Sequence, residues 1–417
     1  MRCSPSCPTC THPDSFAASH GPLAVLGIDV TSAPDKRKPL ACAVGVLNND
    51  TLRIKQLYAV TALRGLPDCT RESASHPQAA ELSETTPVSL EHLLAHEGPW
   101  VAGFDMPFGL PADFLRWWQE TEEPQNKLAE TRQNDQPEVS PAHKDNAHAG
   151  PQDNYGQSCG CSTVGAASGY VRMSAHAGIQ QPSAFAYQKN TKATQAKAVL
   201  CMNTASAAQP DAERTTAFRP LPSWHHYVSR LALLDKEAFR QTVYAFMNTR
   251  PKGQKLPLRL TDNLTDAQSP LRLNYVPVGR MFHAVVPLLT ESAVRIPLLH
   301  ENGDCRVALE VYPALIARDI LGNPPRYKDG SKEQQQERKQ ARAALIHTLP
   351  DYCQSRYGFT LQIEAQQKEV VLEDTKGDML DALLCAIQAA GAARQKNFGM
   401  PELVSETMRS EGWIAAG

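Results

Sequence analysis

The segment LAVLGIDVTSA, residues 23–33, decides the fold that we predict for this chain. Its first six residues are apolar or glycine, as in a buried strand, and it ends in residues typical of turns. Two further strand-like runs follow, LACAVGVL at 40–47 and TLRIKQLYAV at 51–60, and the Asn/Asp cluster at 48–50 between them indicates a hairpin. We therefore expect three successive antiparallel strands.

Alternating strand and helix signals continue along the chain. Residues 89–98 begin with a Ser N-cap and end in Gly, which predicts a helix, and residues 100–111 read as a buried strand. Residues 306–322 predict a strand that leads into a helix ending at a glycine. Two more helices are expected at 331–349 and 375–393. This order predicts a mixed α/β sheet covered by helices.

The domain boundaries follow from changes in composition. Residues 1–21 are rich in Pro, Ser, Cys and His without periodicity and are predicted to be a disordered tail. Residues 120–218 are dominated by Gln, Asn, Ala, Ser, His and Gly, which predicts a low-complexity insertion with no packed core. We expect one domain over 22–395, interrupted by this insertion, and a C-terminal extension over 396–417.

The overall composition narrows the classes of function. The chain has 417 residues and a formal net charge of −2, so only a local basic patch would attract nucleic acid. It has no apolar run long enough for a transmembrane helix and no secretory signal, so we expect a cytoplasmic protein without membrane contacts. The 11 cysteines are scattered and are expected to be reduced thiols.

Five acidic residues lie where a strand or helix would otherwise be apolar. Asp29 ends the run LAVLGID, Asp105 lies in VAGFDMPFG, and Glu310 interrupts VALEVYP. Asp378 and Asp381 lie near the start of the last predicted helix. Charges in such settings are costly unless they are paired, hydrogen-bonded or bound to metal. Oxygen ligands without a His or Cys cluster favour Mg²⁺ or Mn²⁺ over zinc.

Each of these acids also has a structural interpretation. Asp378 and Asp381 are near a helix N-terminus, where the helix dipole favours negative charge. Asp105 is placed to cap the turn that follows it, and Glu310 to pair with a nearby base. The residue pattern leaves both interpretations open.

Six motifs, taken in order, resemble a known family. They are GIDVTSAPDKRKP, GFDMPFGLP, RLTD, ALEVYP, YKDGS and GDMLDALLCAIQAA. Together they resemble the predicted RNase H-fold nucleases catalogued as domain of unknown function number 429, over about residues 23–119 and 224–395. The long insertion is larger than expected for that family.

The resemblance implies both a fold and a metal site. It implies a five-stranded RNase H-like sheet with Asp29 on the first strand and Asp105 on the fourth. Glu310 would lie on a later strand, and Asp378 or Asp381 on the terminal helix. Nucleases of that fold hydrolyse phosphodiesters with two divalent metals that activate water and stabilise the leaving oxygen.

Weaker signals suggest where substrate binds. Arg259 and Asp262 in RLTD, and Lys328 in YKDGS, resemble polar positions of the family and are candidates for contacting substrate phosphate. Thr31 and Ser32 follow the first strand and are placed either to donate to phosphate or to cap a turn. The expected partner is therefore a nucleic acid or nucleotide.

We predict a metal-dependent nuclease or phosphodiesterase and keep two alternatives. A phosphotransferase of the actin and sugar-kinase type would need a glycine-rich phosphate loop after the first strand, and GIDVTSAPDK lacks glycine there. A non-catalytic RNase H-like module that binds nucleic acid or protein would not need the acids to meet in space. No P-loop or dinucleotide-binding glycine motif occurs in the sequence.

Overall fold

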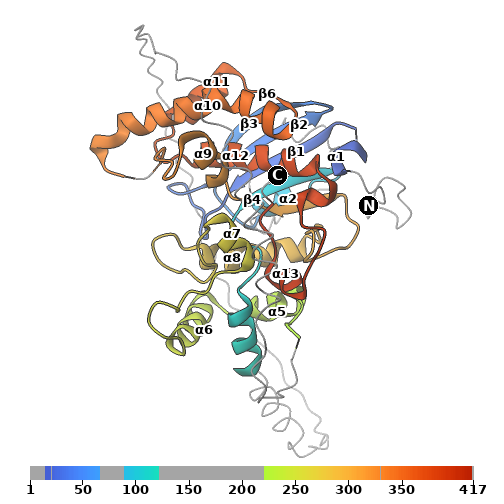
Figure 1. Ribbon diagram of the computed structural model, residues 1–417, viewed down its shortest axis with the longest axis vertical. Helices are drawn as coiled ribbons and strands as arrows, with labels where there is room; N and C mark the ends of the chain where they lie inside the picture. Colours follow the sequence, from blue (N-terminus) through green and yellow to red (C-terminus); the bar gives the residue numbers. More distant parts are fainter. Residues whose placement is uncertain (1–14, 20, 66–88, 122–219, 329, 416–417) are drawn as a thin grey trace, which may run out of the picture. The chain divides into compact units, whose positions relative to one another are not determined.

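A mixed sheet of six strands, in the order β5-β4-β1-β2-β3-β6, forms the core of the computed structural model (Figure 1). The structure describes residues 15–19, 21–65, 89–121, 220–328 and 330–415. The strands are β1 (Leu23–Asp29), β2 (Leu40–Asn48), β3 (Thr51–Val60), β4 (Trp100–Asp105), β5 (Arg306–Glu310) and β6 (Thr360–Gln362).

The first three strands form the antiparallel arrangement that the sequence predicts. β1 pairs with β2, and β2 pairs with β3. A tight turn at Asn49 connects β2 to β3. The φ of Asn49 is 51°, in the left-handed region that Asn tolerates better than most residues. β1 also pairs in parallel with β4, and β4 pairs in parallel with β5.

The sixth strand corrects the prediction of a five-stranded sheet. β6 extends the edge beyond β3 by parallel pairing, and the Thr360 N–H donates to the carbonyl oxygen of Asp50 at 2.7 Å. Only Leu361 of its three residues is buried. A strand of three residues is too short to show the alternation by which strands are recognised.

Helices cover both faces of the sheet. One core joins one sheet face to α2, α5, α6, α8 and a helical stretch at 112–121, and the other joins the opposite face to α9, α10, α11 and α12. The helices are α1 (Phe16–Ser19), α2 (Leu90–Leu94), α5 (Trp224–Leu231), α6 (Lys236–Asn248), α7 (Leu260–Thr265), α8 (Val278–Glu291), α9 (Ala314–Leu321), α10 (Gln335–Tyr357), α11 (Ala365–Glu373), α12 (Asp378–Ala393) and α13 (Glu406–Glu411). Short 3₁₀ turns lie at Lys332–Gln334 and Lys396–Gly399. Among the described residues, no helix combines the length and apolar character needed to cross a membrane.

The predicted helices form, with different ends. α2 begins after Ser89, whose side chain accepts the N–H of His92 at 3.2 Å. The helix expected at 331–349 continues to Tyr357. The last helix begins at Asp378, later than predicted, because the chain turns at Gly377 with a φ of 80°.

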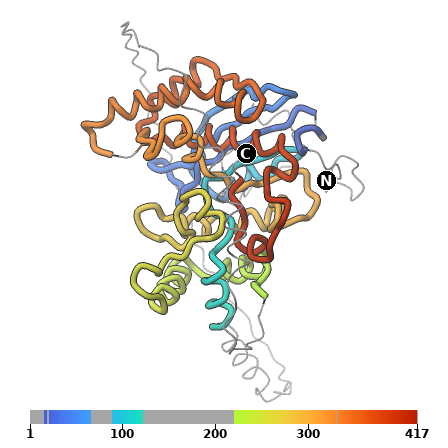
Figure 2. Tube along the Cα trace, viewed as in Figure 1, coloured from blue at the N-terminus to red at the C-terminus, as the bar shows by residue number. Residues whose placement is uncertain are grey.

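Two strand glycines allow α12 to pack directly against the sheet. A Cβ atom on Gly27 would lie 2.0 Å from the backbone oxygen of Ala382, and one on Gly103 would lie 2.5 Å from that of Cys385. No larger residue fits without displacing the helix. Figure 2 shows the C-terminal part of the chain, in red, beside the N-terminal strands, in blue and cyan.

The predicted tail and insertion lie almost wholly outside the described residues. Within the tail, α1 is described, and the ring of Phe16 lies 5.4 Å from that of Phe398. The predicted C-terminal extension contacts the sheet, because the Ala415 N–H donates to the Glu310 carbonyl oxygen at 2.8 Å.

Candidate metal centre

Two aspartates end adjacent parallel strands on the same face of the sheet. Asp29 is the last residue of β1, Asp105 is the last of β4, and the parallel register pairs the two. Gly27 and Gly103, two positions earlier, face α12, and side chains two apart on a strand share a face. Both carboxylates therefore project toward the α12 side.

Helix α12 supplies the third aspartate. Asp381 lies in its first turn, and its side chain is fully buried, whereas Asp29 and Asp105 are half-buried. One carboxylate oxygen from each of the three lies within 4.8 Å of the others. We call Asp29, Asp105 and Asp381 the aspartate site.

The electrostatics of the aspartate site oppose full ionisation. Burial, followed by the charges of Asp381 and Asp105, raises the pKa of Asp29 well above its usual value. Burial also raises the pKa of Asp105, to about 7, although Lys328 opposes the shift. In the described part of the chain, neither Asp29 nor Asp105 accepts a hydrogen bond from a protein group. The aspartate site therefore holds excess negative charge that a proton or a cation would stabilise.

Tyr327 and Lys328 both contact the carboxylate of Asp381. The Tyr327 hydroxyl donates to Oδ1 of Asp381 at 2.5 Å, and the Lys328 ammonium contacts Oδ2. Burial lowers the pKa of Lys328, but the charges of Asp381, Asp105 and Asp29 outweigh it, so the pKa is raised well above its usual value. Lys328 therefore stays charged beside the aspartate site.

Glu310 lies on the other face of the sheet. The β4–β5 register pairs it with Phe104, whose side chain is in the core opposite α12. Because strand side chains alternate between faces, Glu310 and Asp105 point in opposite directions. The two oxygens of Glu310 accept from the guanidinium of Arg259, one of them at 2.8 Å, and the Phe108 N–H donates at 2.9 Å. Glu310 thus follows the structural interpretation, as half of a buried ion pair.

The partners of Glu310 form a larger buried network. Arg259 is 1% exposed and also binds Asp262, with 2.7 Å between Nη2 and Oδ1. Glu411 accepts the N–H groups of Ala112 and Leu260 at 2.6 and 3.0 Å. We call Arg259, Asp262, Glu310 and Glu411 the Arg259 cluster. Two residues predicted to contact substrate, Arg259 and Asp262, are thus enclosed in it.

The remaining predicted residues lie near the aspartate site but outside its ligand group. Asp378 is half-buried at the start of α12, and burial, then Asp374 and Asp381, raises its pKa. Thr31 is buried and Ser32 half-buried, both directly after β1. Of the two helix candidates, Asp381 rather than Asp378 joins the two strand aspartates.

The donor set of the aspartate site fits a hard divalent cation. Three carboxylates offer oxygen ligands, and the group includes no His or Cys. Two of them lack protein donors, so their lone pairs are available. Mg²⁺ or Mn²⁺ suits such a set, and Asp29, Asp105 and Asp381 are the residues that would hold it.

Two further patterns in the sequence point to this arrangement. The pattern Gly-x-Asp occurs both in GID at 27–29 and in GFD at 103–105, where the glycine admits α12 and the aspartate faces its first turn. A basic run, Lys36, Arg37 and Lys38, follows the first aspartate in an exposed loop. The sequence does not predict the burial of Glu411, because its neighbours in the sequence form no apolar pattern.

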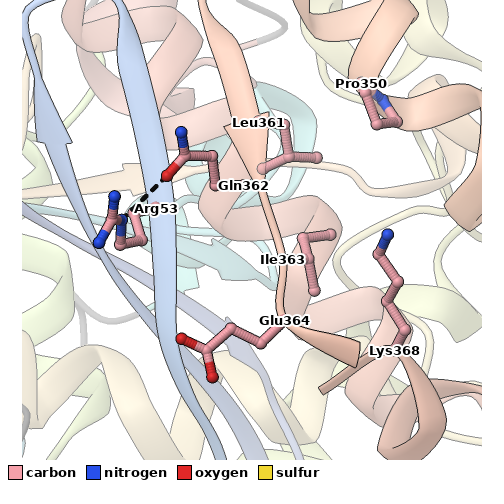
Figure 3. Close-up of a pocket in the computed structure, with 7 residues that line it drawn as sticks. All are labelled: Arg53, Pro350, Leu361, Gln362, Ile363, Glu364 and Lys368. Atoms are coloured by element: carbon pink, nitrogen blue, oxygen red, sulfur yellow. Dashed lines mark hydrogen bonds between the residues drawn. The ribbon is translucent and has the colours of Figure 1, made fainter. Parts of the chain in front are cut away.

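A surface pocket lies apart from the aspartate site, at the β6 edge of the sheet (Figure 3). Its volume is about 260 Å³. Figure 3 shows Arg53 of β3 and Gln362 of β6 joined by a hydrogen bond of 2.9 Å at its wall, with Lys368 on the α11 side. None of the three aspartates lines this pocket.

The fold and the aspartate site together define a mixed α/β protein with a carboxylate cluster suited to a divalent cation. A family model described as "Protein of unknown function (DUF429)" matches residues 288–402. Over that segment, the match agrees with the domain of unknown function that the motifs resemble. The segment includes Lys328 and Asp381, whereas Asp29 and Asp105 precede it. No curated protein and no solved structure matched the chain.

Proposed function

We propose that this protein is a divalent-metal-dependent nuclease or phosphodiesterase with an RNase H-like fold. The observation that carries the proposal is the convergence of Asp29, Asp105 and Asp381 from β1, β4 and α12. Three carboxylates so close together repel one another, and a metal ion bound between them is attracted to all three.

The strand arrangement supports the RNase H-like part of the proposal. Three antiparallel strands are followed by two parallel ones, with acids at the ends of the first and fourth strands and on a C-terminal helix. This is the arrangement that the family resemblance implies, with β6 added at one edge. Glu310, on the opposite face, is not a ligand in our proposal.

A basic loop beside the aspartate site supports a phosphate-bearing substrate. Lys36, Arg37 and Lys38 are exposed on the connection that begins directly after Asp29. The Asp35 side chain accepts the N–H groups of Arg37 and Lys38, each at 2.7 Å, which fixes the turn. The Lys376 ammonium donates to the Arg37 carbonyl oxygen at 2.7 Å, which ties the loop to the start of α12. Such a loop would attract phosphate despite the net charge of −2.

In this proposal, each residue has its own role in hydrolysis. A bound divalent ion would lower the pKa of a water and offset charge on the phosphate. The carboxylates of Asp29 and Asp105 provide ligand oxygens at the strand ends, where the packed sheet fixes their positions. Tyr327 orients the carboxylate of Asp381, and the basic loop positions the phosphate backbone.

The test is cleavage of short end-labelled single-stranded DNA and RNA by the full chain in Mg²⁺ or Mn²⁺. We expect cleavage that stops in EDTA and is lost in the Asp29→Asn, Asp105→Asn double variant. Asp378→Asn is the matched control, because it removes a nearby acid outside the ligand group, and we expect it to cleave.

Equal residual cleavage by wild type and double variant would mean contamination and would favour a non-catalytic module. Consumption of ATP with phosphorylation of a small acceptor would favour the phosphotransferase alternative instead.

A further inference from the structure

Lys328 occupies a cation position inside the aspartate site. Both oxygens of Asp381 already have partners, since Oδ1 accepts from Tyr327 and Oδ2 contacts the Lys328 ammonium. The carboxylate oxygens that Asp29, Asp105 and Asp381 offer all lie within 4.8 Å of one another. The fully buried carboxylate is therefore the one that a protein cation neutralises.

The chain segment that carries Lys328 is held in place. Buried Arg342 of α10 donates to the Tyr327 carbonyl oxygen at 2.9 Å. On the other side, a Cβ atom on Gly377 would lie 3.0 Å from the Lys328 Cβ, so the start of α12 packs against this segment. The side chain of Lys328 is about one-third exposed (34%), yet its backbone is fixed between two helices.

We propose that Lys328 is a resident cation of the aspartate site, and that this site consequently binds one divalent ion rather than two. The ion is held by Asp29, Asp105 and Asp381, while the Lys328 ammonium remains on Oδ2 of Asp381. This inference rests on the proposed function for the presence of a metal and adds the number of ions and the role of the lysine.

The charges of the aspartate site agree with a single ion. Once a bound ion has displaced any proton, three ionised carboxylates and one ammonium leave two negative charges, which one divalent ion balances. A second ion would need the Oδ2 atom of Asp381 that the ammonium contacts, and it would meet the ammonium's like charge at close range. Lys328 thus takes the place that a second metal has in two-metal sites.

The experiment is the binding stoichiometry of Mn²⁺ on the full chain, measured by isothermal titration calorimetry and by counting bound Mn²⁺ with electron paramagnetic resonance. We expect one ion for wild type and two for Lys328→Gln, because the variant frees Asp381. Lys328→Arg keeps the positive charge and should bind one. Lys339→Gln is the matched control, since Lys339 pairs with the exposed Glu373 on the surface, and it should also bind one.

The outcomes separate this inference from the proposed function. Two ions in wild type, or one ion in both wild type and a folded Lys328→Gln variant, would overturn the role of Lys328 and leave the metal-dependent activity standing. No bound ion in wild type would overturn the metal centre itself. If Lys328→Gln does not fold, Lys328→Met, which also removes the ammonium, is counted in its place, and one ion in that variant would overturn the role of Lys328.

Discussion

The aspartate site and the Arg259 cluster lie on opposite faces of the same sheet, yet their acids have different partners. In the Arg259 cluster, Glu310 and Asp262 both bind one guanidinium, and Glu411 accepts two backbone N–H groups. In the aspartate site, the ammonium of Lys328 contacts Asp381, and the carboxylates of Asp29 and Asp105 accept no hydrogen bond from a described protein group. Every acid of the Arg259 cluster therefore has hydrogen-bond donors, so its hydrogen bonding is complete, whereas that of the aspartate site is not.

This difference separates a structural acid from a functional one. A buried carboxylate that is fully paired stabilises the packing around it only as long as its partner remains. A carboxylate left with unused oxygens at a strand end makes the metal-free fold less stable and is available to a ligand. Glu310 and Asp105 show both cases within two adjacent strands, because they point to opposite faces.

The largest effect that we expect is the loss of stability when the Arg259 cluster is broken. Arg259→Ala would leave Glu310 and Asp262 buried without a counter-charge, and we expect a loss of about 3–5 kcal/mol in the free energy of unfolding. Urea denaturation measures it. The control is Arg240→Ala, which breaks an exposed Arg–Glu pair and should leave the free energy of unfolding nearly unchanged. Equal effects in the two variants would contradict the assignment of the Arg259 cluster to stability.

A smaller effect is expected where the helix meets the sheet. Gly27→Ala would place a methyl group against the backbone of α12 and should cost about 1–3 kcal/mol. The displaced helix would also move Asp381, so Mn²⁺ affinity should fall. Gly21→Ala is the control, because a Cβ there meets no atom within 4 Å. Unchanged Mn²⁺ affinity in a destabilised Gly27→Ala variant would show that helix position does not matter to the aspartate site.

The pH dependence of the free energy of unfolding should depend on the aspartate site. The pKa of Asp105 is about 7 in the folded protein against a usual 3.8, so the folded state binds this proton more tightly than the unfolded state. Its contribution to stability is present below about pH 4 and is lost as the pH rises through about 7. In EDTA, the free energy of unfolding should therefore fall between about pH 4 and about pH 7. The fall should be shallower in Asp105→Asn, and equal slopes would contradict the assignment.

The smallest effect is expected for Asp378→Asn. Asp378 lies one turn before Asp381 and outside the ligand group, so its loss removes some repulsion and some favourable interaction with the helix dipole. These effects nearly cancel, and we expect a change below about 0.5 kcal/mol in the free energy of unfolding. Mn²⁺ affinity should stay within about twofold of wild type. A loss of binding as large as that of Asp381→Asn would show that Asp378 is also a ligand.

Local patterns predicted most of the fold, and the exceptions have physical causes. The apolar runs of β1 to β5 and the caps of α2 and α9 are visible in the sequence, and these elements formed. β6 is too short to show a period, and its pairing depends on the distant β3. The end of α10 depends on packing beyond Pro350, which a local pattern does not contain.

The candidate site was partly predictable for the same reason. Asp29 and Asp105 end apolar strands, so their cost of burial is visible locally. The face on which Glu310 lies depends on the register between β4 and β5, and its partner Arg259 is 51 residues away in sequence. The choice between Asp378 and Asp381 depends on the exact start of α12, which Gly377 shifts by a few residues.

The most direct test of the metal centre is a crystal of the full chain soaked in Mn²⁺ and measured at the manganese absorption edge. We predict an anomalous peak between the carboxylates of Asp29 and Asp105, on the α12 side of the sheet, and no peak at the Arg259 cluster. A well-ordered aspartate site without a peak, in crystals where Mn²⁺ binds elsewhere, would contradict the account.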